Sequence, residues 1–398
     1  MTAYYIWLAG CLGRGAAAAY NLLREYQNPR ACYQALAHNP ASWNTFSPEQ
    51  RKRLDAFTLD DAHRVMESCA KKGIDILTID NVSYPERLKN IYAPPVVLYS
   101  RGKLPDFERL IAVAIVGSRR TSDYGAAAAT RLGYDLAAAG AVVVSGMALG
   151  IDARAHRGAL DAGGITAAVL GCGADIAYPP ENESLMLDIE QNGVILTEYP
   201  PGEKPVGKHF PARNRIIAGL CNGVVVVEAP QKSGALITAT LALEQGRDIF
   251  AVPGSIFSEA GEGTLRLLRD GAIPVGSAYD ILIEYEGMYA DKLMLNRVPR
   301  RYYDIAPKKA EAASATRQKP AVPAPQLPTA RPSPRKEALP EHLSRQAAAV
   351  YQALEKNRRH VDEIAQRTGL TMPEVLAALT ELELEELAHA HPGRQYSA

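Results

Sequence analysis

Residues 114–125 read AIVGSRRTSDYG, where an apolar run ends at Gly117 and is followed by a serine and two arginines. The run over residues 110–116 has hardly a polar break, which is typical of a strand covered on both faces in a parallel sheet. Gly117 allows a sharp turn, and Ser122 or Asp123 is placed to cap the alanine-rich helix that follows. The stretch therefore predicts a strand, loop and helix whose loop binds an anion at the carboxyl end of the strand.

Similar apolar runs recur through the middle of the chain and alternate with helical patterns. This alternation is the signature of an α/β fold, and we expect a Rossmann-like, doubly wound and mostly parallel sheet. The expected strands are IAVAIVG (111–117), AVVVSG (141–146), ITAAVLG (165–171), VILTEY (194–199), GVVVVEA (223–229) and DIFAVPG (248–254).

Composition limits the classes of protein that this chain can be. Lys and Arg number 44 and Asp and Glu number 44, so any binding to a polyanion depends on a local surface. The five cysteines show no CxxC spacing, which predicts neither a metal site nor a disulfide framework and fits a reducing cytoplasm. The apolar opening has no cation before Arg14, and no stretch approaches the roughly 20 apolar residues of a membrane helix. We expect a cytoplasmic protein without membrane association, metal or cofactor.

The 398 residues predict several domains, and composition changes along the chain suggest where they meet. Residues 1–85 have helical periodicity and turn signals, which predict a small helical domain. Residues 86–290 hold the α/β pattern, and residues 291–342 form a Pro- and Ala-rich linker. Residues 343–398 recover helical periodicity, with a turn at Gly369, an N-cap at Thr371 and a terminal hairpin, as in a winged helix.

The candidate binding residues follow the expected strands. In an open parallel sheet the loops at the carboxyl ends converge on one crevice, where glycine amides, hydroxyls and cations can hold phosphate. Phe210 stands in KPVGKHFPARNRIIAGL (204–220), a segment without an acid, and a ring among cations suits a single-stranded nucleic acid. The predicted site comprises Gly117, Ser118, Arg119, Arg120, Ser145, Gly146, Lys208, Phe210, Arg213, Asn214, Arg215, Lys232, Ser233 and Gly234.

Simpler roles exist for some of these side chains. Phe210 could pack in the core, and Arg213 or Arg215 could form a structural ion pair with Glu198 or Glu228. Glycines in tight βα turns are required by every doubly wound fold, whether or not a ligand binds there.

Familiar catalytic and nucleotide motifs are missing. The sequence after Gly117 fits neither GxGxxG nor GxxxxGK[ST], which disfavours an NAD enzyme and a P-loop ATPase. Asp152 is a formal candidate for a catalytic acid, but it is more simply an N-cap of the following helix.

Several long motifs together resemble the DNA-processing protein A family, also called Smf. They are IVGSRRTSDYG, SGMALGID, AVLGCGADIAYPPEN, FPARNRIIAGL, VVVEAPQKSGALITA, GRDIFAVPG and GTLRLLRDGA, all within residues 107–286. The resemblance implies an N-terminal SAM-like helical domain, a C-terminal winged helix, and a protein that protects incoming single-stranded DNA in natural transformation and helps to load RecA. By position it implies DNA contacts at Arg119, Lys208, Phe210 and Lys232. We also expect a homodimer formed through the Rossmann-like domain.

Two rival functions belong to other classes. Rossmann-like nucleotide hydrolases of the lysine-decarboxylase-like group share the general layout, but their PGGxGTxxE segment is absent here and the eight histidines form no triad. We therefore expect a binding protein and not an enzyme. A transcription factor is suggested only by the helix-turn-helix tail.

The tail departs from what a DNA-reading helix requires. Its second helix, residues 372–386, carries Glu374, Glu381, Glu383, Glu385 and Glu386 and no Lys or Arg. Most of these acids are expected to face water and to be repelled by phosphate, while Val375, Leu376, Leu379 and Leu382 form the buried stripe. The pattern favours a protein-contacting or regulatory module over a DNA reader, with a solubilising appendage as the simpler alternative.

Overall fold

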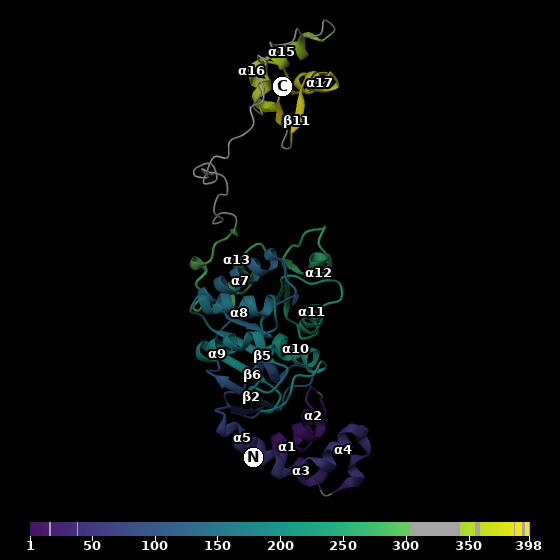
Figure 1. The fold of residues 1–398 in the computed structure, drawn as a ribbon, viewed down its shortest axis with the longest axis vertical. Coiled ribbons are helices and arrows are strands. Elements are labelled where there is room, and N and C mark those ends of the chain that lie inside the picture. The colour runs from purple at the N-terminus through teal and green to yellow at the C-terminus, as the bar shows by residue number, and fades with distance from the viewer. Residues whose placement is uncertain are drawn as a thin grey trace, which may run out of the picture. The chain divides into compact units, whose positions relative to one another are not determined.

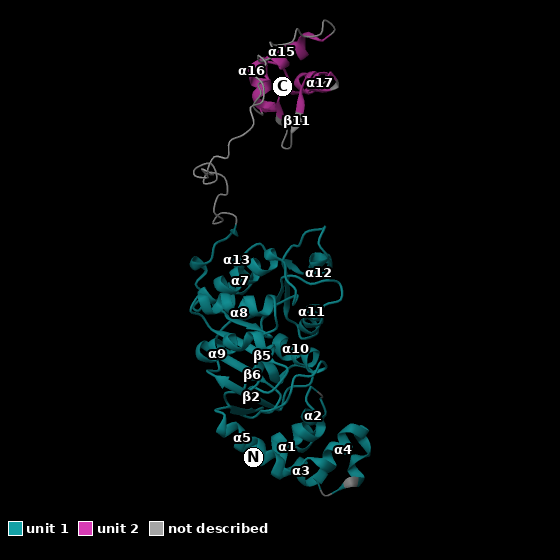
Figure 2. Cartoon of the chain, in the orientation of Figure 1, with its two compact units in different colours: residues 1–310 teal, residues 311–398 magenta. Residues whose placement is uncertain are grey.

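A computed structural model describes residues 1–302 except 16 and 38, and residues 343–397 except 355–358, 386 and 392–394. The chain divides into two compact units, residues 1–310 and residues 311–398 (Figure 2). The predicted linker lies outside the described residues from residue 303 onward. Within the described ranges, no helix has both the length and the apolar character needed to cross a bilayer.

The first unit begins with the predicted group of helices, which gathers beside the strand β2 in Figure 1. Thr58 and Asp61 form a capping box at the start of the fifth helix, and the indole of Trp7 donates to the carbonyl of Phe57 at 2.9 Å. The first helix is buried on nearly all sides, which explains its apolar sequence. The elements are α1 Thr2–Leu12, α2 Ala18–Tyr26, α3 Pro29–Ala37, η1 Pro40–Thr45, α4 Pro48–Ala56 and α5 Leu59–Lys71.

A nine-stranded sheet forms the centre of this unit, in the order β1-β2-β6-β5-β4-β3-β7-β8-β9. The strands from β6 to β9 in this order pair in parallel, whereas β2 is antiparallel to both β1 and β6. The prediction of a mostly parallel doubly wound sheet is confirmed. The strands are β1 Asp75–Thr78, β2 Val97–Gly102, β3 Ala112–Val116, β4 Val142–Ser145, β5 Thr166–Leu170, β6 Gly193–Thr197, β7 Gly223–Val226, β8 Asp248–Ala251 and β9 Ile273–Pro274.

All predicted strands are present, and β1, β2 and β9 were not predicted. The strand β1 lies within the segment predicted as the helical domain, yet it pairs with β2 and extends the sheet. The strands β1 and β9 are only 4 and 2 residues long, which is too short for a distinct alternating pattern.

Helices cover both faces of the sheet, and the apolar strand runs result from this. In β3, Val113 and Ile115 pack in a core with α7 and α8, while Ala114 and Val116 pack in the core beneath α10 and α11. Successive side chains of a strand point to opposite faces, so both sets must be apolar. The main helices are α7 Asp123–Ala138, α8 Ile151–Asp161, α9 Glu183–Asn192, α10 His209–Leu220, α11 Gly234–Glu244, α12 Glu262–Arg269 and α13 Ala278–Leu282.

The chain order reverses at β3, which lies between β4 and β7. From β3 the chain continues through β4, β5 and β6 toward one edge of the sheet. It then crosses to the other side of β3 and forms β7. Such a switch point leaves a crevice outside the carboxyl ends of the strands, where ligands of open α/β sheets bind. The loop that begins at Gly117 lies at this point.

The second unit is the predicted winged helix. It comprises α15 Arg345–Ala353, β10 Arg359–His360, α16 Val361–Thr368, α17 Met372–Leu384, β11 His389–His391 and β12 Gln395–Ser397, and its sheet has the order β10-β12-β11. Gly369 ends α16 with a φ of 68°, and Thr371 caps α17 in a capping box with Glu374.

Two details of α17 differ from expectation. Leu376 is 42% exposed, whereas Val375, Leu379 and Leu382 are buried as predicted. Glu381 turns toward α15, where its carboxylate accepts hydrogen bonds from the Ser344 backbone at 2.7 Å and hydroxyl at 2.6 Å. This acid holds two helices together, and Glu386 lies outside the described residues.

Candidate ligand-binding pocket

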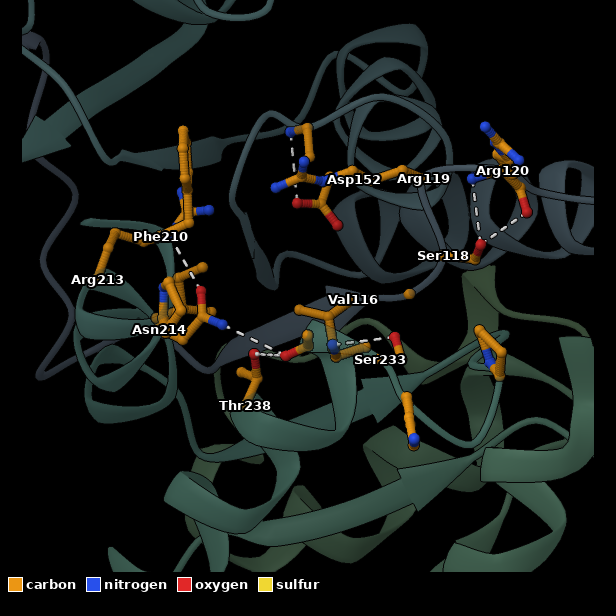
Figure 3. Close-up of a pocket in the computed structure, with 18 of the residues that line it drawn as sticks. Val116, Ser118, Arg119, Arg120, Asp152, Phe210, Arg213, Asn214, Ser233 and Thr238 are labelled. Atoms are coloured by element: carbon orange, nitrogen blue, oxygen red, sulfur yellow. Dashed lines mark hydrogen bonds between the residues drawn. The ribbon is translucent and has the colours of Figure 1, made fainter. Parts of the chain in front are cut away.

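A cavity of about 830 Å³ opens at the carboxyl ends of β3 and β7. Figure 3 shows Phe210, Arg213 and Asn214 on one side of it and Ser118 and Arg120 on the opposite side. The cavity brings together most of the predicted site residues from three separate segments: Gly117, Ser118, Arg119, Arg120, Phe210, Arg213, Asn214, Lys232, Ser233 and Gly234. The predicted convergence of the loops is therefore observed.

Glu228, at the end of β7, holds the loop that follows β3. Its buried carboxylate accepts hydrogen bonds from the Thr121 hydroxyl at 2.9 Å, from the Ser122 amide at 3.0 Å and from the Ser122 hydroxyl. Its carbonyl accepts from the Ser118 amide at 2.8 Å. Because Glu228 is occupied by the loop backbone and hydroxyls, it does not neutralise Arg119, which stays exposed to a ligand.

Ser122 also caps α7, since its hydroxyl accepts from the Gly125 amide at 3.1 Å. Of the two caps predicted for this helix, Ser122 and Asp123, the structure shows Ser122. At Gly117 a Cβ atom would lie 2.6 Å from the Ile151 side chain, so the glycine is needed for close packing of the loop on α8.

Arg119, Phe210 and Tyr178 form an array at the mouth of the pocket. The Arg119 Cζ atom lies 5.5 Å from the centroid of the Phe210 ring, and the Tyr178 ring lies 5.4 Å from it at 30°. Phe210 is only partly buried and belongs to neither core of the first unit, so the alternative of core packing is not observed. Tyr178 was missed from the sequence, although it follows β5 in the quoted AYPPEN segment and is 36% exposed.

Lys232, Ser233 and Gly234 line the pocket where α11 begins. Ser233 is the N-cap, and its hydroxyl accepts from the Ala235 amide at 3.2 Å. Lys232 is exposed and has no ion-pair partner among the described residues. The positive dipole of the helix start favours an anion here, beside the ammonium group.

Two buried charged side chains, Arg213 and Asp152, line the cavity. The Arg213 guanidinium donates to the carbonyls of Gly146, at 3.0 Å, and Val169, and burial lowers its pKa to about 10. Asp152 accepts from the amides of Gly146 at 3.2 Å and Ala148 at 3.4 Å, and burial raises its pKa. The N-cap of α8 is Gly150, so the prediction that Asp152 caps this helix is wrong; its carboxylate binds the preceding loop instead.

The other predicted site residues do not line the cavity. Arg215 is buried and donates two hydrogen bonds of 2.8 Å to the carboxylate of Glu198. It therefore forms the structural ion pair that was the alternative to DNA binding. Ser145 is buried and donates to the Ile115 carbonyl at 2.6 Å. Gly146 packs against Arg213, where a Cβ atom would lie 2.4 Å from its guanidinium. Lys208 is exposed at the N-cap of α10.

The cations of the segment 204–220 therefore do not share one surface. Because α10 packs against the sheet, Arg213 and Arg215 point inward from it, and Phe210 is left at the rim. Missed lining residues include Thr238, which lies within the motif VVVEAPQKSGALITA, and Glu259, which lies outside all the quoted motifs. In the part of the chain that the structure describes, no group of His, Cys, Asp and Glu is arranged to hold a metal ion. All cysteines are buried and unpaired.

The fold and the pocket define a class: a Rossmann-like protein with a cationic and aromatic pocket at its switch point, followed by a winged helix. The chain belongs to the DNA recombination-mediator protein A family. The sequence pattern of this family matches residues 75–286. Residues 334–394 match the DprA winged helix domain.

Relatives with related names support this placement. The chain is 46% identical over 230 residues to DNA processing protein DprA of Streptococcus pneumoniae, covering 58% of this chain and 80% of that protein. It is 36% identical over 356 residues to Protein Smf of Synechocystis, covering 87% and 84%. The X-ray structure of the Streptococcus pneumoniae DNA processing protein A matches with a TM-score of 0.63 and 37% identity, covering 71% of this chain and 98% of that one.

Proposed function

We propose that this chain binds single-stranded DNA in the pocket between Arg119, Phe210 and Lys232. One observation carries the proposal. The exposed cations Arg119 and Lys232, the start of α11 and the accessible ring of Phe210 line the same cavity. Single-stranded nucleic acid needs this combination, because cations hold its phosphates and rings stack on its bases. Membership of a DNA recombination-mediator family points to the same ligand.

The cations and the rings of the pocket have different roles in this proposal. Arg119 and Lys232 hold phosphate, helped by the positive end of α11, whereas Phe210 and Tyr178 offer ring surface to a base. Stacking requires a base whose face is free, so duplex DNA binds more weakly than a single strand. Backbone contacts and stacking read base edges poorly, so affinity varies little with sequence.

We infer the cellular role from the family to which the chain belongs. We propose that the protein works in the cytoplasm, protects single-stranded DNA that enters during natural transformation, and assists the loading of RecA onto it. We also propose a homodimer formed through the Rossmann-like domain. Sedimentation of the purified protein and a RecA strand-exchange assay on coated DNA test these parts separately.

We further propose that the pocket binds without catalysis. Its buried carboxylate, Asp152, is directed to the amides of Gly146 and Ala148 and lies beside Arg213. Stabilising the loop in this way accounts for Asp152 without a reaction. The rival hydrolase predicts that nucleoside monophosphates are cleaved on prolonged incubation, whereas our proposal predicts that they are recovered intact.

We retain the division into 1–85, 86–290, 291–342 and 343–398 as a proposal, with the last segment acting as a protein-contacting or regulatory module. In α17 the exposed residues include Glu383, and no Lys or Arg occurs over Met372–Leu384. Such a surface suits a cationic protein partner better than a phosphate backbone.

A competition titration tests the proposed ligand. A labelled single-stranded oligonucleotide is bound to the full chain and challenged with unlabelled single strand, duplex of the same sequence, or a mononucleotide. We expect only the single strand to compete efficiently. Efficient competition by the mononucleotide would favour the hydrolase class, and a preference for one duplex sequence would favour the transcription factor.

A further inference from the structure

A second groove lies between α7 and α8, outside the pocket described above. It has a volume of about 460 Å³ and is lined by Asp123, Ala126, Ala127, Thr130, Arg131 and Tyr134 of α7 and by Arg154 of α8. These α7 residues span about 16 Å along the helix axis at 1.5 Å per residue. That length is several times the roughly 3.4 Å spacing of stacked nucleotides in one strand.

The groove begins where the pocket loop ends. Arg119 and Arg120 line the pocket, and the same loop continues through Ser122 into the start of α7. On the other side, the first amide of α8, that of Ile151, donates to the Ser118 carbonyl at 3.2 Å. A Cβ atom at Gly150 would lie 2.7 Å from the Arg119 carbonyl, so α8 starts in direct contact with the loop.

The side chains of the groove suit a nucleic acid. Arg154 is exposed and has no ion-pair partner among the described residues. Tyr134 is 41% exposed, and the Arg131 guanidinium lies 5.8 Å from its ring centroid while pairing with Asp135 at 2.7 Å. Asp123 is the acid of the lining, at the first turn of α7.

We propose that this groove is a second subsite for single-stranded DNA, which takes the nucleotides that leave the pocket past Arg120. Arg154 contacts a phosphate, and Tyr134 offers a ring for a base. The occupant is the continuing strand because the loop after β3 leads from the pocket into α7, and each cavity holds an arginine and an exposed aromatic ring. The proposal rests on the proposed function of the pocket.

Oligonucleotide length separates the two subsites. Thymidine oligonucleotides of about 4 and about 16 residues, the range of single-strand sites in other proteins, are titrated against the full chain. We expect Arg154→Ala to leave the affinity for the short strand within about 2-fold and to weaken the long strand about 3-fold or more, with a salt slope shallower by about 0.7. Tyr134→Ala should weaken the long strand selectively as well.

Arg157→Ala is the matched control. Arg157 lies one turn further along α8 and pairs with Asp188 at 2.7 Å, and both side chains are more than two-fifths exposed. Its loss changes the net charge by the same amount outside the groove and costs little stability. We expect both lengths to bind this variant as they bind the wild type.

The outcomes are distinguishable from failure of the proposed function. If Arg154→Ala matches wild type at both lengths, or matches Arg157→Ala, the groove is not a DNA subsite, while sensitivity to Arg119→Ala still supports the pocket. If wild type binds neither strand, or Arg119→Ala has no effect, the function of the pocket itself is wrong.

Discussion

The guanidinium of Arg119 lies 5.5 Å from the centroid of the Phe210 ring, which joins the loop after β3 to the first turn of α10. These residues are far apart in the sequence and meet only because both segments reach the switch point of the sheet. Glu228 fixes the loop on one side, and the packing of α10 fixes the ring on the other. Contacts within the protein thus hold both sides of the pocket.

Removing either unneutralised cation should weaken binding of single-stranded DNA. Arg119→Ala and Lys232→Ala each delete a proposed phosphate contact at an exposed position, so the fold should persist and the salt slope should fall by about 0.7. Fluorescence anisotropy over a series of salt concentrations measures this. Arg109→Ala, at an exposed residue paired with Asp106 in its own turn, is the control. Wild-type affinity across the salt series would show that the pocket is misplaced.

Phe210 is predicted to stack on a base. Phe210→Ala should reduce the free energy of binding by about 1–3 kcal/mol, whereas Phe210→Tyr should retain most of it because a ring remains. The salt slope should stay unchanged, because no phosphate contact is lost. Equal losses in the two variants would contradict stacking.

The burial of His156 predicts that the free energy of unfolding decreases in acid. Its Nδ1 lies 2.7 Å from the Thr166 hydroxyl, and burial lowers its pKa to about 3. As the pH falls from about 6.5 toward 3, the unfolded chain gains a proton here that the folded chain does not. His156 therefore makes the free energy of unfolding fall by about 1.4 kcal/mol per pH unit within this window.

His156→Asn, which can keep a nitrogen near Thr166, should remove this contribution. Urea unfolding followed by circular dichroism at several pH values measures the difference in slope between variant and wild type. A wild-type slope in the His156 variant would rule out a buried neutral histidine.

The winged helix is predicted to be dispensable for the pocket. A chain that ends at about residue 308 should bind single-stranded DNA within a few-fold of the full chain, because every proposed contact lies before that residue. Circular dichroism provides the control for folding. A collapse of affinity in the folded, truncated protein would place part of the DNA site in the tail or the linker.

The sequence predicted the parallel strands well because each is a short apolar run that ends in glycine or a polar residue. It also predicted that the loops after β3 and β7 meet, since topology alone brings carboxyl ends together. The strands β1, β2 and β9 were missed because short edge strands have weak patterns, and antiparallel β2 follows no βα rhythm.

Which cations face the ligand could not be predicted. Arg213 and Arg215 belong to one cationic segment with Lys208, and only the orientation of α10 against the sheet buries the two arginines. Tyr178 was missed for a related reason, because its contact with Phe210 joins the loop after β5 to α10. Such contacts depend on the packing of whole elements and not on local pattern.

Photochemical crosslinking tests the central claim most directly. A single-stranded oligonucleotide that carries 5-iodouracil is irradiated with the full chain, and the crosslinked peptides are identified by mass spectrometry. We predict crosslinks at Phe210 or Tyr178, which Arg119→Ala reduces in parallel with affinity. Crosslinks confined to residues 343–397, with none in the peptides that line the pocket, would contradict the account.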